Sequence, residues 1–264
     1  MTLFIGVPCY GSQLYCQFAQ CLVRLTSLLT ELKIKHTIEF LGSDSLISRA
    51  RNTIVAKFYS DINYSHLLFL DSDLMFAPEA VVEMLQADVE LIGCPYPKKI
   101  YNWTKVSNVL ASTSINEDHK PLLTDINYNF LPTEQKVESS IIKCKDIPTG
   151  FMLMRRSLLS TMMLAYPERK YQNNIAGIDG RASDYFFDFF GTGVVNNYYL
   201  SEDYYFCYLV RKLGIDCHLE TKYTFGHIGK EIFYGNLGLQ LQYFKNDDMN
   251  MDRQLIKKQQ IADK

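Results

Sequence analysis

The first third of the chain alternates short apolar runs with segments whose apolar residues recur every three or four positions. A continuous apolar run of about five residues is typical of a strand buried on both faces, and the longer period is typical of an amphipathic helix. The expected strands are residues 3–7, 37–41, 66–70 and 89–93. The expected helices are residues 14–32, 45–59, with Asp44 or Ser45 as the cap, and 78–87, which begins at a proline.

This alternation predicts the α/β class: a mostly parallel central sheet of Rossmann-like type, flanked by helices on both faces. Ligands of such sheets bind beyond the carboxyl ends of the strands. The segments that follow the first three strands should therefore converge on one site. They carry Pro8 and Tyr10, Asp44, and the pair Asp71 and Asp73.

The rest of the chain is less regular. Residues 95–140 are rich in Asn, Lys, Thr and Tyr and are expected to form loops with at most a hairpin, and residues 166–199 are expected to form a loop or lid. The expected strands are 141–145, 151–154, 215–219 and 223–225, and the expected helices are 155–165 and 201–213. The polar tail after residue 245 reads as a frayed helix.

Composition narrows the class of protein. The 264 residues include 27 basic and 29 acidic side chains, a net charge of −2, which excludes a protein whose main role is to coat nucleic acid. No apolar run reaches the length of a membrane helix, and the N-terminus reads as a strand instead of a signal peptide. Seven cysteines without a C-x-x-C pair indicate free thiols in a reducing compartment.

The strongest chemical signal is Leu67-Leu68-Phe69-Leu70-Asp71-Ser72-Asp73. An apolar strand here delivers two carboxylates to its exposed end, where they can hold Mg²⁺ or Mn²⁺ together with phosphate oxygens. A pair of aspartates that caps the helix starting at Pro78 is the plainer interpretation.

Two further segments carry candidate chemistry. Glu202 and Asp203 follow Ser201 at a helix start, where they either stabilise the helix terminus or deprotonate an acceptor hydroxyl. His227 lies in a Gly226-His227-Ile228-Gly229 segment, expected just after a strand. A lone histidine is usually structural, but a neutral imidazole there could complete a metal shell that Asp73 begins.

These signals occur in the order and near the spacing of the GT-A glycosyltransferases, enzymes related to glycosyltransferase family 2. The chain resembles most the compact single-domain versions from phages and large algal viruses. The matching stretches are IGVPCYG, SLISRARN, FLDSDL, TGFMLMRRS, SEDYYFC and FGHIG, which span residues 3–229. The resemblance implies a metal-dependent transfer of a sugar from a nucleoside diphosphate sugar to a hydroxyl of a glycan or glycoconjugate.

The resemblance also implies roles for individual residues. Those that would bind the nucleotide sugar are Pro8, Tyr10, Asp44, Ser48, Arg51, Asn52, Asp71 and Ser72. A guanidinium at Arg51 matches phosphate or sugar hydroxyls, and a salt bridge that locks Asp71 is nearly as good an interpretation. Tyr96, Lys98 and Lys99 follow a strand end, where they could hold phosphate.

For the metal, the resemblance implies Mn²⁺ or Mg²⁺ on Asp73 and His227, with Asp71 beside them. For catalysis it implies Asp203 as the base of an inverting enzyme, with Glu202 as its rival. A relative that retains anomeric configuration would not use Asp203 as a plain base.

One domain is expected at 1–245, with a nucleotide-binding half at 1–94, an acceptor half at 95–245 and a polar tail at 246–264. The expected partners are a UDP- or GDP-sugar and a glycan acceptor, with no nucleic acid and no membrane span. The expected location is the cytoplasm, that of the host if the protein is viral. Neither the sugar nor the oligomeric state is readable from the sequence.

Three alternatives stay open. A nucleotidyltransferase also uses carboxylates at strand ends, but it needs a Gly-rich basic loop after the first strand, where this chain has Gly11 alone. A non-catalytic carbohydrate- or nucleotide-binding protein of the same fold would not need every candidate acid and ligand. A glycoside hydrolase needs two carboxylates but no His–Asp metal pair.

Overall fold

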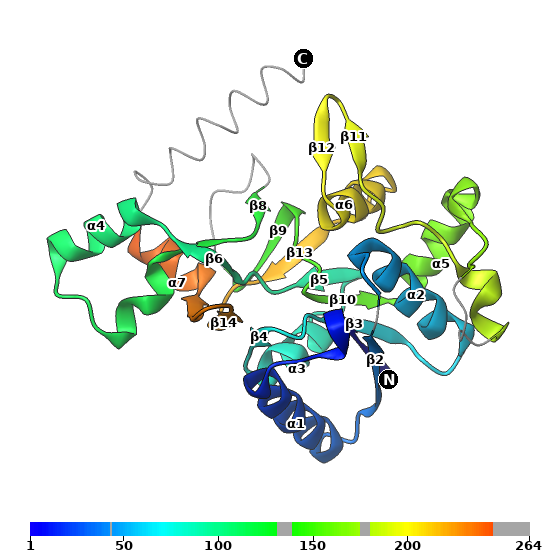
Figure 1. The fold of residues 1–264 in the computed structure, drawn as a ribbon, viewed down its shortest axis with the longest axis horizontal. Helices are drawn as coiled ribbons and strands as arrows, with labels where there is room; N and C mark the ends of the chain where they lie inside the picture. Colours follow the sequence, from blue (N-terminus) through cyan, green and yellow to red (C-terminus); the bar gives the residue numbers. More distant parts are fainter. Residues whose placement is uncertain (43, 131–138, 175–179, 245–264) are drawn as a thin grey trace.

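The computed structural model describes residues 1–42, 44–130, 139–174 and 180–244 (Figure 1). The first elements are β1 (Thr2–Cys9), α1 (Cys16–Glu31), β2 (Lys35–Gly42), α2 (Ile47–Ser60), β3 (His66–Leu70), β4 (Leu74–Met75), α3 (Pro78–Gln86), β5 (Leu91–Gly93), β6 (Pro97–Tyr101), α4 (Trp103–Ser112) and β7 (Thr124–Ile126). The later ones are β8 (Asn129–Phe130), β9 (Ile141–Asp146), β10 (Phe151–Arg155), α5 (Arg156–Ala165), β11 (Gly193–Val195), β12 (Tyr198–Leu200), α6 (Glu202–Lys212), β13 (Cys217–Glu220), β14 (Phe225–Ile228), β15 (Ile232–Gly235) and α7 (Leu237–Tyr243). None of the helices within these ranges is long and apolar enough to cross a membrane.

An 8-stranded sheet in the order β2-β1-β3-β10-β5-β13-β9-β8 forms the centre of the molecule. Strands β2, β1, β3, β5, β13 and β8 run in one direction, and β10 and β9 run in the other. The protein is therefore a single mixed α/β domain of Rossmann-like type, as the sequence predicted. The sequence did not predict that β10 would lie between β3 and β5, antiparallel to both.

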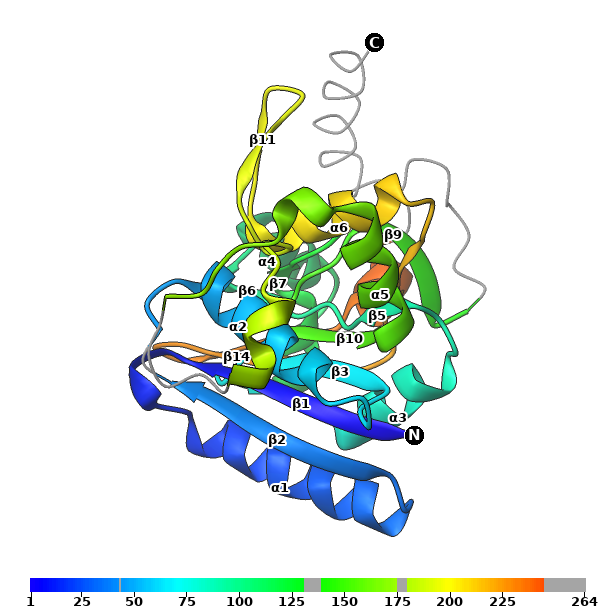
Figure 2. The same cartoon turned by 90° about the vertical axis from the view of Figure 1, so that its right-hand side faces the viewer.

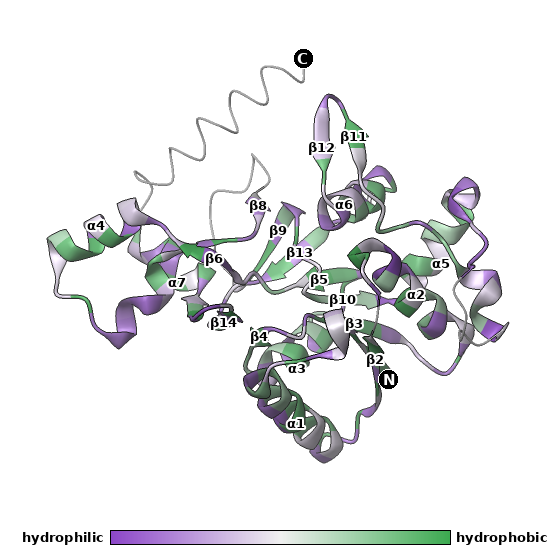
Figure 3. Cartoon of the chain, viewed as in Figure 1, coloured by the Kyte–Doolittle hydropathy of each residue, from purple (hydrophilic) through white to green (hydrophobic). Residues whose placement is uncertain are grey.

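The core has one layer on each face of this sheet. In β3, Leu67 and Phe69 pack into the layer with α2, α5 and α6, whereas Leu68 and Leu70 pack into the layer with α1 and α3. Each fully buried side chain of this size contributes roughly 1.5–3 kcal/mol. Because both faces are covered, residues 67–70 of β3 are all apolar and do not alternate with polar ones. Figure 3 shows hydrophobic colour concentrated on the central strands. Figure 2 shows α1 lying along β1 and β2.

The expected cap of α2, Asp44 or Ser45, was wrong by two residues or one. The helix begins at Ile47, with Leu46 as its N-cap and no side-chain cap bond. Asp44 instead accepts a hydrogen bond from the backbone N–H of Leu46 at 2.9 Å and binds Arg49. An aspartate that bonds the backbone two residues onward forms a local turn, which delays the helix start.

The expectation of loops at 95–140 was also partly wrong. Asn102 caps α4 by accepting a hydrogen bond from the backbone N–H of Lys105 at 3.1 Å, and β6 pairs with β7 in an antiparallel ribbon. The polar composition hid the helix, because its stripe of buried residues is reduced to Val109. Residues 131–138 lie outside the described residues, as does the predicted helical tail after 245.

The segment predicted as a loop or lid contains a hairpin, β11–β12. Its two-residue turn is Asn196-Asn197, with φ angles of 50° and 66°. Two left-handed residues are what the favoured hairpin turn requires, and asparagine tolerates that conformation. Residues 175–179 of the same segment are outside the described residues.

His66 makes the stability of the sheet depend on pH. Burial, together with the charges of Arg155 and the amino terminus, lowers the pKa of its imidazole to about 4. Between pH 6.5 and 4 the unfolded chain binds a proton at His66 and the folded chain does not. The free energy of unfolding is therefore full above pH 6.5 and falls as the pH falls toward 4. We expect the free energy of unfolding to fall by about 3 kcal/mol through this residue alone.

Urea denaturation of the wild type and of His66→Gln between pH 7 and pH 4 measures this dependence. The variant should lose less stability than the wild type over that range, and His36→Gln serves as the control. Equal losses in the wild type and His66→Gln would contradict the assignment.

Candidate active site

The carboxyl ends of β1, β2 and β3 meet around a cavity of about 290 Å³. We call it the strand-end cavity. Because the three strands are parallel neighbours, the segments that follow them open on the same edge of the sheet. Its lining includes eight of the residues that the sequence singled out: Pro8, Tyr10, Asp44, Arg51, Asp71, Ser72, Asp73 and Glu202.

Arg51 is the buried cation of this site. It lies on α2 with only 2% of its surface exposed, and its Nη2 donates to Oδ1 of Asp71 at 3.0 Å. Its Nε lies 3.6 Å from Oε1 of Glu202. Burial would lower the pKa of Arg51, but the charges of Asp71 and Glu202 outweigh it and raise that pKa above its ordinary value. Nε and Nη1 have no hydrogen-bond partner among the described residues, so the guanidinium has donors to spare for an anion.

Asp71 is held from two sides. Arg51 binds one carboxylate oxygen, and the other lies against Gly150, at the start of β10, where a Cβ would come within 2.4 Å of it. The same Cβ would come within 2.4 Å of the buried hydroxyl of Tyr96. Only glycine leaves room for both groups, so Gly150 fixes the position of Asp71. The sequence stretch TGFMLMRRS contained this glycine without indicating its role.

Backbone pairing brings His227 to Asp73. Strand β4 follows Asp73 directly and pairs with β14, with Leu74 opposite His227. The backbone N–H of Ile228 donates to the carbonyl of Asp73 at 2.8 Å. His227 therefore lies within β14, not after a strand as expected, and its Nε2 is 3.3 Å from Oδ2 of Asp73.

The donor set of this pair fits a divalent cation. Nδ1 of His227 is 2.8 Å from the carbonyl of Pro97, and since a carbonyl can only accept, Nδ1 carries the proton. When Nε2 carries no proton, its lone pair and the Asp73 carboxylate are two ligands that a divalent cation between them could bind. Adjacent ligands of an octahedral Mg²⁺ are about 3 Å apart, close to the observed separation.

Lys99 supplies positive charge to the same carboxylate, with Nζ at 2.6 Å from Oδ2 of Asp73. Burial raises the pKa of Asp73, but its contacts with His227 and Lys99 outweigh burial and hold that pKa below its ordinary value. Within the described ranges, no three or more His, Cys, Asp or Glu side chains are grouped to hold a metal ion. The expectation that Asp71 joins the metal pair is therefore not supported, because Asp71 is turned to Arg51.

The two candidate catalytic carboxylates face different surroundings at the start of α6. Glu202 lines the strand-end cavity and accepts a hydrogen bond from Thr149 at 3.4 Å, a partner that the sequence did not suggest. Asp203 is buried outside the lining and accepts hydrogen bonds from the hydroxyl of Ser201 and the backbone N–H of Tyr204. Burial raises the pKa of Asp203 above its ordinary value.

Two of the residues predicted to bind the nucleotide sugar do not line the cavity. Ser48 is not part of its lining. The amide of Asn52 is fully used elsewhere: it donates to Asp188 at 2.9 Å and accepts from the backbone N–H groups of Phe189 and Phe190 at 3.1 Å each. Asn52 thus anchors the segment before the β11–β12 hairpin. Residues 51 and 52 point in different directions because they are consecutive on a helix.

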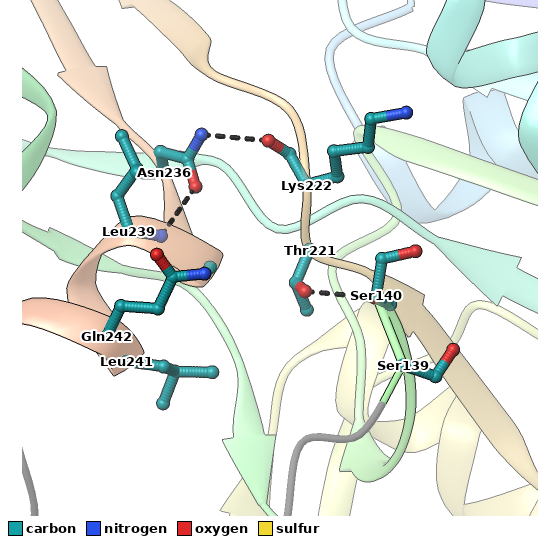
Figure 4. Close-up of a pocket in the computed structure, with 9 residues that line it drawn as sticks. Ser139, Ser140, Thr221, Lys222, Asn236, Leu239, Leu241 and Gln242 are labelled. Atoms are coloured by element: carbon teal, nitrogen blue, oxygen red, sulfur yellow. Dashed lines mark hydrogen bonds between the residues drawn. The ribbon is translucent and has the colours of Figure 1, made fainter.

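A second cavity, of about 370 Å³, lies between α7 and the segment after β13 (Figure 4). Its polar groups bind one another. Asn236 donates to the carbonyl of Lys222 and accepts from the backbone N–H of Leu239, and Thr221 donates to the carbonyl of Ser140. These contacts cap α7 and join strand ends, so they serve the fold.

Comparisons with known proteins give distant likenesses. No protein-family model and no curated protein match the chain. The crystal structure of A197 from STIV aligns with a TM-score of 0.46 at 13% identity, covering 89% of this chain and 95% of that chain. A putative glucose-1-phosphate thymidylyltransferase from Bacillus anthracis, in complex with a sucrose, aligns with a TM-score of 0.27 at 13% identity, covering 61% and 74%. We draw no function from either likeness.

Arg51→Met should be strongly destabilising, because it leaves Asp71 and Glu202 close together without their shared cation. The expected loss in free energy of unfolding is about 3–5 kcal/mol, and Arg51→Lys should lose less because it keeps the charge. Arg49→Met, on the same helix, is the matched control: its pair with Asp44 is more exposed, so the loss should be much smaller. Urea denaturation curves measure all three. Equal losses in Arg49→Met and Arg51→Met would show that the contacts of Arg51 with Asp71 and Glu202 stabilise the fold no more than a surface ion pair does.

Proposed function

We propose that the protein is a metal-dependent glycosyltransferase of the GT-A type, which moves a sugar from a nucleoside diphosphate sugar to a hydroxyl of a glycan or glycoconjugate. One observation carries this proposal. Asp73, whose carboxylate contacts His227, borders a single cavity at the strand ends together with the Arg51 guanidinium and the Glu202 carboxylate. This reaction needs three groups: a pair of side chains that binds a metal cation, a donor that binds an anion, and a potential base.

The donor would lie across the strand ends. Mn²⁺ or Mg²⁺ bound by Asp73 and His227 would act as a Lewis acid and offset the negative charge of the diphosphate. Arg51 holds Asp71 in place and has two unpartnered donor nitrogens beside it. Pro8, Tyr10, Asp44 and Ser72 line the same cavity and would border the nucleoside. Tyr10 is 79% exposed, which leaves its ring free to cover a base.

In the transfer step, the acceptor hydroxyl oxygen forms a bond to the anomeric carbon of the sugar. The bond from that carbon to the phosphate oxygen breaks, and its electron pair leaves with the nucleoside diphosphate. The hydroxyl proton passes to a carboxylate. Glu202 is the better placed of the two candidates, because it lines the cavity and Asp203 does not. Asp203 would hold the first turn of α6 through Ser201 and Tyr204.

A nucleotidyltransferase is the second candidate, and the products separate the two. It would join a nucleoside triphosphate to a sugar phosphate and release pyrophosphate, whereas a glycosyltransferase releases a nucleoside diphosphate. The short helical turn Tyr10–Ser12 that follows β1 contains one glycine and no basic residue, which favours the glycosyltransferase.

Donor binding is tested by melting temperatures with UDP or GDP, each with MnCl₂ or with EDTA. Ligand at about a hundred times its Kd should raise the melting temperature by about 5 °C or more, and the shift should require Mn²⁺. Asp73→Asn should lose the Mn²⁺-dependent part, while Asp216→Asn, on an exposed surface pair, should retain it. No shift across a panel of nucleoside diphosphates with Mn²⁺ would contradict the proposal.

The role of Glu202 is tested by kinetics with a nucleotide sugar that the thermal-shift panel identifies. Glu202→Gln should lower kcat for nucleoside diphosphate release by roughly 10²–10⁴ with little change in the KM of the donor, because proton transfer is lost and donor contacts remain. Asp203→Asn should have the smaller effect on kcat. The reverse order would assign the base to Asp203.

A further inference from the structure

A third cavity lies on the far side of the α6 N-terminus from the strand-end cavity. It has a volume of about 460 Å³ and is bordered by β8, β9, α6 and the β11–β12 hairpin. Four tyrosines line it: Tyr198, Tyr199, Tyr204 and Tyr208. We call it the tyrosine cavity. Figure 1 shows the hairpin projecting from the body of the molecule beside α6. The volume falls in the range of small-molecule sites, about 300–1,000 Å³.

A buried ion pair forms the polar floor of this cavity. Asp146 is 3% exposed, and it accepts a hydrogen bond from Nη2 of Arg211 at 3.3 Å and one from the amide of Asn129 at 3.0 Å. Nε of Arg211 is buried and has no hydrogen-bond partner among the described residues. The Asp146 carboxylate is buried and Arg211 is partly exposed, so the unpartnered Nε is a polar donor that a bound ligand could satisfy.

The hairpin is a fixed wall of the cavity and not a loose loop. Its paired strands and its Asn196-Asn197 turn set the direction of each side chain. Val195 and Tyr198 are cross-strand partners and both line the cavity. Of the next pair, Val194 and Tyr199, Tyr199 is part of the lining and Val194 is not. Tyr198 and Asn196 thus line the cavity from the same β11–β12 hairpin.

We propose that the tyrosine cavity binds a saccharide. A sugar ring presents C–H groups on its faces and hydroxyls around its edge. Tyrosines offer the matching surface, a flat apolar ring with a polar tip, and amide, carboxylate and guanidinium groups complete the hydroxyl contacts. Asp146 and Arg211 cancel in charge, and the other charged residue of the lining, Lys145, is exposed. The buried end of the cavity therefore suits a neutral hydroxylated ligand.

The position of the cavity suggests what this saccharide does. Glu202 lines the strand-end cavity and Tyr204 lines the tyrosine cavity, and residues two apart on a helix point to opposite sides. The first turn of α6 therefore separates the two cavities. We assign the tyrosine cavity to the part of the acceptor glycan next to its reacting sugar, an assignment that rests on the proposed function.

Saccharide binding is tested without donor or metal, so that its outcome does not depend on the transferase activity. The probes are lactose, cellobiose, maltose and chitobiose at millimolar concentration, observed by saturation-transfer difference NMR. At least one should bind the wild type, with the transfer strongest at ring C–H protons. Tyr198→Ala and Asn196→Gly should each weaken its Kd by about tenfold or more. Glycine at position 196 retains the left-handed turn, so that variant should stay folded.

Val194→Ala is the matched control, on the same hairpin but outside the cavity lining, and it should bind as the wild type does. Circular dichroism and melting temperature establish that each variant is folded. Binding by none of the probes, or equal binding by the wild type and both cavity variants, would overturn the proposal. Saccharide binding that survives in a protein with no nucleoside diphosphate binding would support this site and reject the transferase.

Discussion

The rest of the site depends on one interaction, the buried Arg51 guanidinium between the carboxylates of Asp71 and Glu202. Arg51 comes from α2, Asp71 from the end of β3 and Glu202 from the start of α6, so one buried cation joins three elements that are far apart in the sequence. Removing such a charge from water costs several kcal/mol, which well-placed apolar side chains would avoid. Apolar side chains would stabilise this position better than a buried charge. The charge of Arg51 is therefore better explained by the two carboxylates that it holds in place.

The sequence predicted the outline of this site because parallel sheets impose it. Apolar runs of strand length locate β1, β2 and β3, and the geometry of the fold then brings the residues after them to one edge. The pairing of Asp73 with His227 was a hypothesis from the sequence, and the register of Leu74 opposite His227 could not be read from it. Periodicity identifies a strand but not its neighbour, which is why the position of β10 was missed. The direction of side chains on α2 was also predicted wrongly. Asn52 is next to Arg51 in the chain, but it binds Asp188 and does not line the strand-end cavity.

The two cavities on either side of α6 differ in chemistry. The strand-end cavity is bordered by charged groups that suit a metal ion and phosphates, and the tyrosine cavity combines aromatic rings with a neutralised ion pair. A helix start between them is a rigid support, because its first turn is held by tertiary contacts from Arg51 and Thr149 on one side and Asn127 on the other. A shift of either ligand would be felt by the same few residues.

The strand β10 also governs when the protein can fold. It occupies the place between β3 and β5, yet it is translated long after both. At about 5–20 residues per second, the ribosome leaves the edges of these two apolar strands unpaired for several seconds. Nascent chains in that interval expose a template for wrong pairing, so synthesis of this protein should depend on chaperones that cover sheet edges.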